Sequence, residues 1–323
     1  MNRGSRGFRM LKDNWLERQL ATVKELLETG QQHVKDNSLV QAEASLKEAA
    51  IILDSAESVT SRVLKMRFVV FNELAMIAGR THDGNGALNN YLKALKALDA
   101  LEEPASLERV TILVNLGGVY AAGGRLAESE AASRRAIEIL DGLKEPNEHA
   151  RLMKLFASYH LGAALHAGVD PATAYAPLCD AVEAGETLGP QALQTAKPLI
   201  IECLGRLAHL AALSERFAEA IERETKASVI ALELHEQSRE TSYLNAYANG
   251  LLRLINYCEA GGRFALAEDA IFKLLGMFPK RPEVIARGKK FYHAILALSD
   301  EALEGGDLPR DEAEESLKEL ETL

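Results

Sequence analysis

Few side chains in this sequence have the type and spacing that metal binding or thiol chemistry requires. His160 and His166 stand six residues apart, so on a helix they point in well-separated directions, and no His-Glu-x-x-His or Cys/His cluster accompanies them. Cys179, Cys203 and Cys258 never stand in Cys-x-x-Cys spacing, and we expect them to be small buried side chains. The sequence therefore predicts no metal site.

Nucleotide binding and catalysis find no better support in the residue pattern. The stretch Gly84-Asn85-Gly86 lies between two expected helices and lacks the Lys-Ser/Thr that completes a phosphate-binding loop. No Ser/His/Asp arrangement can be assigned from spacing, because catalytic triads assemble in space. We therefore expect no catalytic residue, no cofactor and no enzymatic activity.

Basic side chains gather in one segment of an acidic chain. The formal net charge is −10, which argues against the broad cationic surface that nucleic-acid binding requires. Ammonium and guanidinium groups suit carboxylates, so the basic segment after Pro279 is a candidate patch for an acidic ligand. Solvated helix faces without a ligand are the alternative. The bases of this patch are Lys280, Arg281, Arg287, Lys289 and Lys290.

The elements that must position such residues repeat along the chain. Pairs of small side chains seven residues apart share a helical face, and successive pairs are 42 to 46 residues apart. The pairs are Ala42/Ala49, Ala87/Ala94, Ser129/Ala136, Ala174/Ala181 and Ala220/Ala227. Small residues let two helices approach closely, so the spacing predicts a repeated two-helix unit that buries its apolar face by stacking.

The clearest copy reads Asn115-Leu116-Gly117-Gly118-Val119-Tyr120, followed by a turn at Gly123-Gly124 and a second helix with small residues. This pattern resembles the tetratricopeptide (TPR) repeat. The period exceeds the 34 residues of the commonest TPR and is similar to the long repeats of kinesin light chains, Pins/LGN adaptors and peptide-sensing bacterial regulators. The resemblance implies an all-α helix-turn-helix solenoid, a right-handed superhelix of about seven helix pairs.

The domain organisation follows from the repeat. We expect a basic N-terminal extension over residues 1–14 and a single TPR solenoid over residues 15–323. The expected helix pairs lie near residues 15–56, 62–103, 106–143, 149–187, 192–235 and 241–279, with a capping pair at 282–322.

The resemblance also implies where a partner binds. In the family, the first helix of each pair lines a concave groove, and the residue before the Leu of Leu-Gly points into it. This row of positions holds Glu28, Glu73, Asn115, His160, Arg206 and Arg253. Neighbours about one helical turn from its last two members add His209, Asn249 and Asn256. The implied partner-binding residues are Asn115, His160, Arg206, His209, Asn249, Arg253 and Asn256. Asn115 best matches the amide that holds a peptide backbone, and an amide bonded within the helix packing is the alternative.

Two functions remain open from the sequence. The first is a non-enzymatic scaffold or adaptor that binds a peptide segment of another protein. An acidic segment is one candidate for this ligand. The second is a peptide-sensing regulator whose superhelix changes shape on ligand binding. Self-association through the end repeats is compatible with both. Residues 1–65 show no basic recognition helix of the helix-turn-helix type.

The expected location is the cytoplasm. No apolar run approaches the roughly 18 residues of a membrane span, so we expect no membrane insertion. The odd number of cysteines fits a reducing compartment. The N-terminus is basic but lacks the apolar region of a secretory signal, and an organellar targeting signal is the alternative.

Overall fold

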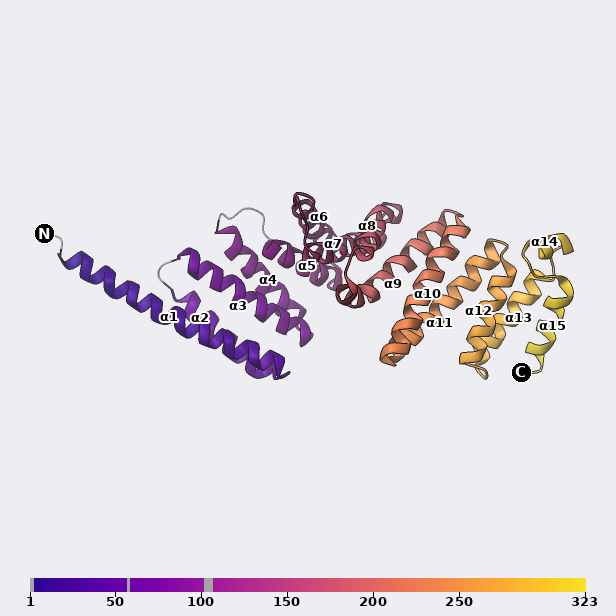
Figure 1. The fold of residues 1–323 in the computed structure, drawn as a ribbon, viewed down its shortest axis with the longest axis horizontal. Coiled ribbons are helices and arrows are strands. Elements are labelled where there is room, and N and C mark those ends of the chain that lie inside the picture. Colours follow the sequence, from indigo (N-terminus) through magenta and orange to yellow (C-terminus); the bar gives the residue numbers. More distant parts are fainter. Residues whose placement is uncertain (1–2, 57–58, 102–106) are drawn as a thin grey trace. The chain divides into compact units, whose positions relative to one another are not determined.

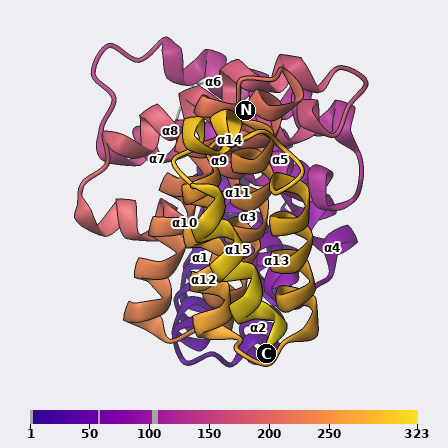
Figure 2. The ribbon, with the colours of Figure 1, turned by 90° about the vertical axis from the view of Figure 1, so that its right-hand side faces the viewer.

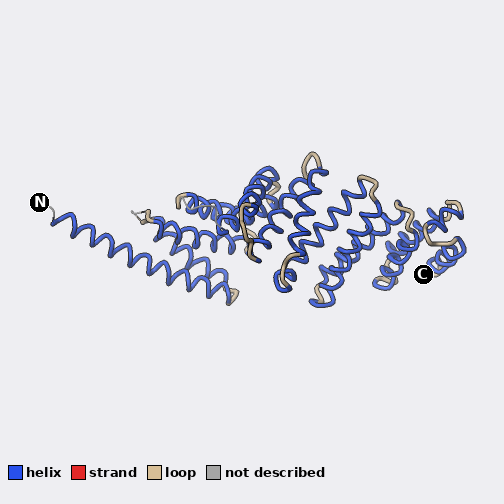
Figure 3. Tube along the Cα trace, turned by 45° about the horizontal axis from the view of Figure 1, so that its top comes forward, coloured by secondary structure: helices blue, strands red, loops and turns tan. Residues whose placement is uncertain are grey.

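The chain is helical in every described element. The computed structural model describes residues 3–56, 59–101 and 107–323, and within these ranges it contains fifteen α-helices, one short 3₁₀-helix and no strand (Figure 3). This confirms the predicted all-α class. The chain divides into two compact units, Met1–Ala164 (unit 1) and Leu165–Leu323 (unit 2). The expected repeat boundaries at residues 103 and 106 lie outside the described residues.

Unit 1 consists of successive helices that pack in pairs (Figure 1). The pairs are α1 (Arg3–Lys35) with α2 (Leu39–Asp54), α3 (Ser61–Arg80) with α4 (Gly84–Asp99), and α5 (Leu107–Ala122) with α6 (Leu126–Asp141). Helix α7 (Glu148–His166) follows, and its last two residues, Leu165 and His166, belong to unit 2. Because α1 begins at Arg3, residues 3–14 of the expected extension belong to the first helix, while residues 1 and 2 lie outside the described residues.

Unit 2 continues the pairwise packing. Its elements are η1 (Pro171–Ala174), α8 (Tyr175–Glu186), α9 (Pro190–Leu213), α10 (Phe217–Ser238), α11 (Thr241–Ala260), α12 (Phe264–Met277), α13 (Pro282–Ile295), α14 (Asp300–Gly305) and α15 (Arg310–Glu321). Helices α9 and α10 form one pair and α11 and α12 another. At the C-terminal end α13 packs against α15, with the short α14 between them in sequence (Figure 2).

The predicted small-residue pairs lie in the cores of the two units. All ten side chains, from Ala42 to Ala227, are no more than 1 % exposed. All but Ala174, which ends η1, stand on α2, α4, α6, α8 or α10, where a larger side chain would push the neighbouring helix away. The helical register assigned from the sequence is therefore confirmed.

The turns within the pairs share one backbone conformation. The residue two positions after the first helix adopts a positive φ in five pairs: Asn37 (56°), His82 (60°), Gly124 (71°), Glu215 (59°) and Gly262 (65°). The next N–H then bonds a carbonyl five residues back, as in Arg125 to Tyr120 at 2.8 Å, which closes the helix end in a Schellman arrangement. The connection from α7 to α8 departs from this pattern and runs through η1.

Helices α2, α4 and α6 each end on an aspartate, although a negative charge is unfavourable at a helix C-terminus. A base from the following helix faces each of them. We call these contacts the last-turn links, and they are Asp54–Arg67, Asp99–Arg109 and Asp141–Lys154. Arg67 and Arg109 also donate to the carbonyl oxygens of Leu53 (2.8 Å) and Leu98 (3.2 Å), so each base satisfies the end of the preceding helix.

Candidate functional site

Two residues of the predicted groove meet in one pocket of unit 1. Asn115 on α5 and His160 on α7 both line a cavity of about 300 Å³, which we call the Asn115–His160 pocket. The other lining residues are Tyr91 on α4, Val114, Gly118 and Val119 on α5, and Met153 and Phe156 on α7. The pocket thus combines two polar side chains with largely apolar walls.

Helical spacing explains why these residues share the pocket. On α5, Asn115 stands three residues before Gly118 and four before Val119, so the three lie on one face. On α7, Phe156 and His160 are separated by four residues and likewise share a face. Helices α5 and α7 therefore present facing stripes with the cavity between them.

Gly118 allows the imidazole of His160 to lie close to α5. A Cβ at position 118 would stand 3.2 Å from both Cε1 and Nε2 of His160, tighter than ordinary van der Waals contact. The ring of Tyr159 lies beside the imidazole, with 5.2 Å between the two ring centroids. The position of the His160 ring in the pocket is thus set by the missing side chain on the facing helix.

The side-chain amide of Asn115 makes no hydrogen bond within the part of the chain that the structure describes. The residue is half-buried at the pocket wall. A carboxamide has both donors and an acceptor, so it can pair with the N–H and the C=O of a peptide backbone. The hydrogen-bond donors and acceptor of this amide are therefore available to a ligand in the cavity, next to the apolar surface of Val114 and Val119.

Glu73, which precedes Asn115 in the predicted row, is used inside the unit. Its carboxylate accepts a hydrogen bond from Nε2 of Gln31 at 3.0 Å, which joins α3 to α1. Burial, with a smaller contribution from the charge of Glu73, raises the pKa of Tyr91 to about 12. Tyr91 therefore lines the Asn115–His160 pocket as a neutral phenol at physiological pH.

In unit 2, Arg206 and His209 lie beside a third residue that the sequence did not assign to them. The ring centroids of His209 and His166 are 5.6 Å apart in an edge-to-face arrangement. Burial lowers the pKa of His166, and its electrostatic interactions with Arg206 and His209 lower it further. Arg206 itself approaches Glu202, one turn earlier on α9, at 3.5 Å.

Arg253 is held by a buried acid. Its Nε and Nη2 each donate to a carboxylate oxygen of Glu224 on α10 at 2.9 Å, and Glu224 is fully buried. These hydrogen bonds raise the pKa of Arg253. The guanidinium therefore belongs to the contact between α10 and α11, while Asn249, one turn earlier on α11, is exposed.

The residues of the expected acidic-ligand patch point in different directions. Arg287 turns toward α11, where Nη2 donates to Asn256 (2.8 Å) and to Glu259 (2.7 Å). The guanidinium of Arg281 stacks on Phe278, 5.0 Å from the ring centroid. Lys280 and Lys290 are exposed, and Lys289 is half-buried. The basic segment thus divides between helix packing and solvent, and Asn256 is partnered within the fold.

Residues 10–323 match a family described as a family of unknown function, DUF6483. The chain belongs to this family. The sequence matches none of the curated proteins.

Solved structures resemble the DUF6483 chain along most of its length. The crystal structure of apo RapI has 14 % identity and a TM-score of 0.53, covering 93 % of this chain and 86 % of that one. The crystal structure of BtubC (BKLC) from P. vanneervenii has 16 % identity and a TM-score of 0.50, covering 88 % and 93 %. The DUF6483 chain has the fold of TPR-like repeat proteins, as the repeat resemblance implied. None of its described helices is both long and apolar enough to span a bilayer.

Six pocket residues were not assigned to a site from the sequence of the DUF6483 chain: Tyr91, Val114, Gly118, Val119, Met153 and Phe156. Phe156 stands one helical turn before His160, and that spacing is the signal that could have found it. A second signal is Gly118, since a glycine in a helix interior destabilises the helix and calls for a close neighbour. Tyr91 comes from the preceding helix pair and has no local signal.

Proposed function

We propose that this chain is a non-enzymatic protein-interaction scaffold that binds an extended peptide segment in the Asn115–His160 pocket. One observation carries the proposal. The Asn115 amide stands at the wall of a largely apolar cavity with no hydrogen-bond partner in the described part of the chain. A peptide offers both what the amide can bind and side chains for the apolar walls.

The size of the pocket supports a peptide over a large cofactor. At about 300 Å³ it lies at the lower limit of the ~300–1,000 Å³ typical of small-molecule sites. The neighbouring pocket, of about 580 Å³, shares Gly118 and Val119 with it and extends to the turn at Gly123 and Arg125. An extended segment running along α5 could contact both cavities in sequence.

The cysteines support the expected location of this scaffold. Cys179, Cys203 and Cys258 are all unpaired. Free thiols are typical of proteins in reducing compartments, so we place the scaffold in the cytoplasm.

Selection from a random displayed peptide library tests the proposal. A selected peptide is synthesised with a fluorophore, and its Kd is measured by anisotropy for the wild type and for Asn115→Ala. Loss of hydrogen bonds to a peptide backbone, at ~0.5–1.5 kcal/mol each, should weaken binding by about tenfold. Asn89→Ala is the matched control, because Asn89 is an exposed amide on α4 outside the pocket.

Two results would reject the proposal. One is a library that yields no binder to the folded chain. The other is a set of binders whose Kd is the same for wild type, Asn115→Ala and Asn89→Ala. Circular dichroism spectra of the variants establish that each is folded before binding is compared.

A further inference from the structure

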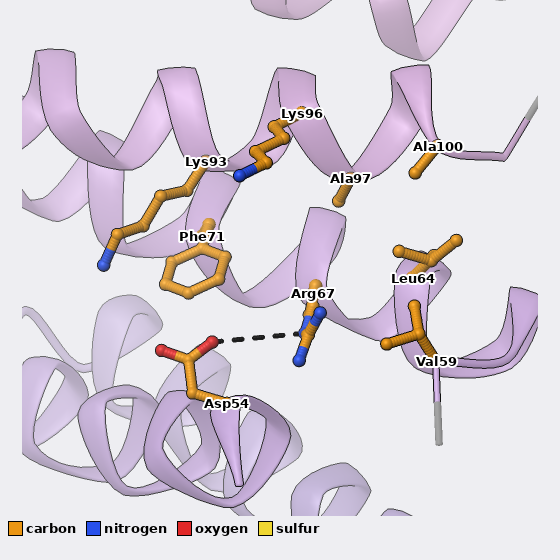
Figure 4. A pocket seen from close by; sticks show the side chains of 9 residues that line it. All are labelled: Asp54, Val59, Leu64, Arg67, Phe71, Lys93, Lys96, Ala97 and Ala100. Atoms are coloured by element: carbon orange, nitrogen blue, oxygen red, sulfur yellow. Dashed lines mark ion pairs between the residues drawn. The ribbon is translucent and has the colours of Figure 1, made fainter. Parts of the chain in front are cut away.

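A second pocket of unit 1 opens on a different side of α3 (Figure 4). It has a volume of about 380 Å³ and lies between the end of α2, helix α3 and the second half of α4. Phe71 forms part of its wall, whereas Glu73 marks the predicted groove. Two residues along an α-helix turn the side chain through about 200°, so the two positions face nearly opposite ways. The cavity is thus separate from the Asn115–His160 pocket.

The inner surface of this pocket is apolar. Phe71, Leu64 and Ala97 are 4 %, 8 % and 4 % exposed, so their apolar atoms face the cavity or the core. Figure 4 shows Leu64 and Val59 together at one end of the cavity. Val59 is 58 % exposed and stands at the rim. A ligand group at this end would gain free energy by removing apolar surface from water.

The other end of the pocket is basic. Lys93 and Lys96 project from α4 over the side of the cavity that holds Phe71 (Figure 4). The ammonium of Lys93 is 4.9 Å from the centroid of the Phe71 ring. Neither lysine forms an ion pair with another described residue, and both are exposed.

Arg67 adds a third positive charge between the two ends. Its Nη2 donates to the Leu53 carbonyl, and its Nε lies 4.0 Å from Asp54. That Nε is buried and has no hydrogen-bond partner within the described residues. Among the residues that the structure describes, three bases and one acid line the cavity, an excess of two positive charges.

We propose that this pocket is a second docking site, which binds an acidic peptide segment. A carboxylate of the segment lies between Lys93 and Lys96, and a neighbouring apolar side chain of the segment packs on Val59 and Leu64 at the other end. Because positive charge lies beside an apolar surface, the pocket favours a ligand that carries an anionic group and an apolar group a few ångströms apart. Neither a neutral apolar segment nor a purely acidic one satisfies both ends.

The test uses three labelled synthetic peptides: Glu-Leu-Glu-Leu-Glu, its glutamine analogue Gln-Leu-Gln-Leu-Gln, and its serine analogue Glu-Ser-Glu-Ser-Glu. Binding to the full chain is measured by fluorescence anisotropy. The first peptide should bind, and both analogues should bind on the order of tenfold more weakly. Binding of the first peptide should also weaken when salt is raised from about 50 to about 300 mM.

Charge reversal locates the site. Lys93→Glu with Lys96→Glu should weaken binding of Glu-Leu-Glu-Leu-Glu by on the order of tenfold or more, because like charges then face the carboxylates. Lys24→Glu with Lys47→Glu is the matched control: it makes the same change in net charge with exposed lysines on α1 and α2. Asn115→Ala should leave this binding unchanged, so the outcome is independent of the function proposed above.

Several results would overturn the assignment. These are no binding of Glu-Leu-Glu-Leu-Glu at about millimolar concentration, equal binding of its glutamine analogue, or equal loss of binding in the two double lysine variants. Hexanoate serves as a competitor. If it displaces the peptide with a similar molar affinity, the occupant is a small amphipathic acid, and the peptide assignment is wrong.

Discussion

The imidazole of His160 lies against the backbone of Gly118 on the facing helix, where a Cβ would stand 3.2 Å from two of its ring atoms. A glycine inside a helix is less stable than alanine by roughly 0.5–1 kcal/mol. Helix α5 thus gives up stability at the position where α7 brings a polar ring into the Asn115–His160 pocket. The two residues should therefore behave as an energetic pair.

A double-mutant cycle measures this coupling. In the His160→Ala background, Gly118→Ala should stabilise the chain by about 0.5–1 kcal/mol, because the helix gains and nothing opposes the methyl group. In the wild-type background the gain should be lost, since the imidazole must move. Urea denaturation followed by circular dichroism gives the four free energies of unfolding. Equal effects of Gly118→Ala in the two backgrounds would contradict the close contact.

The buried ion pair of unit 2 should respond unequally to loss of its two members. Arg253→Met leaves the fully buried carboxylate of Glu224 without its cation, which should cost about 3–5 kcal/mol of unfolding free energy. Glu224→Gln leaves Arg253, whose side chain is 43 % exposed and can be hydrated, so the loss should be smaller. Thermal and urea denaturation of both variants give the order. A larger loss for Glu224→Gln would be the opposite result.

Burial should protect two of the three thiols from alkylation. Desolvation raises the pKa of Cys203 and of Cys258 to about 12, so almost no thiolate is present near pH 8. Burial also raises the pKa of Cys179, but this side chain is partly exposed. Iodoacetamide should therefore modify Cys179 first in the folded chain, and all three when guanidinium chloride is present. Peptide mapping by mass spectrometry distinguishes the sites, and early labelling of Cys203 would refute the burial.

His166 should make stability depend on pH on the acidic side of neutrality. Folding lowers its pKa, so the unfolded chain takes up the proton more readily. The contribution of neutral His166 is complete above the unfolded value of ~6.5 and decreases as pH falls below it. Between about pH 7 and pH 5.5, the melting temperature of the wild type should fall more than that of His166→Gln.

NMR titration of the His166 ring gives a direct readout of the same shift. Its midpoint should lie below that of the unfolded chain in urea, and Arg206→Gln should raise it by removing one of the positive charges nearby. A midpoint at or above the unfolded value would show that desolvation does not act on this ring.

The sequence predicted the helix register because the register depends on local periodicity. Ala136 and Ala181, for instance, are buried as their spacing required. It also assigned Asn115 and His160 to one row of positions in neighbouring repeats, and both residues line one pocket. Features that repeat along the chain were thus within reach of sequence reasoning.

Side-chain contacts between different helices could not be predicted from the sequence. The direction of the Arg253 side chain is set by Glu224, which lies 29 residues earlier on another helix. No sequence motif links these two positions. Likewise, Arg287 was expected in a basic patch, but its charge is directed to Glu259 on α11. Opposite charges pair across helices when the packing brings them together. The net charge of a segment does not show which of its charges are paired in this way.

The last-turn links of unit 1 also bear on how that unit melts. Each of them joins the final residue of one helix pair to the first helix of the next, as Asp99 is joined to Arg109. Such a contact belongs to a boundary between repeats. In a nearest-neighbour description it therefore adds to the interfacial term and not to the intrinsic stability of either repeat. Arg67, Arg109 and Lys154 thus increase unfolding cooperativity, so that fraying at one repeat is coupled to the integrity of its neighbours.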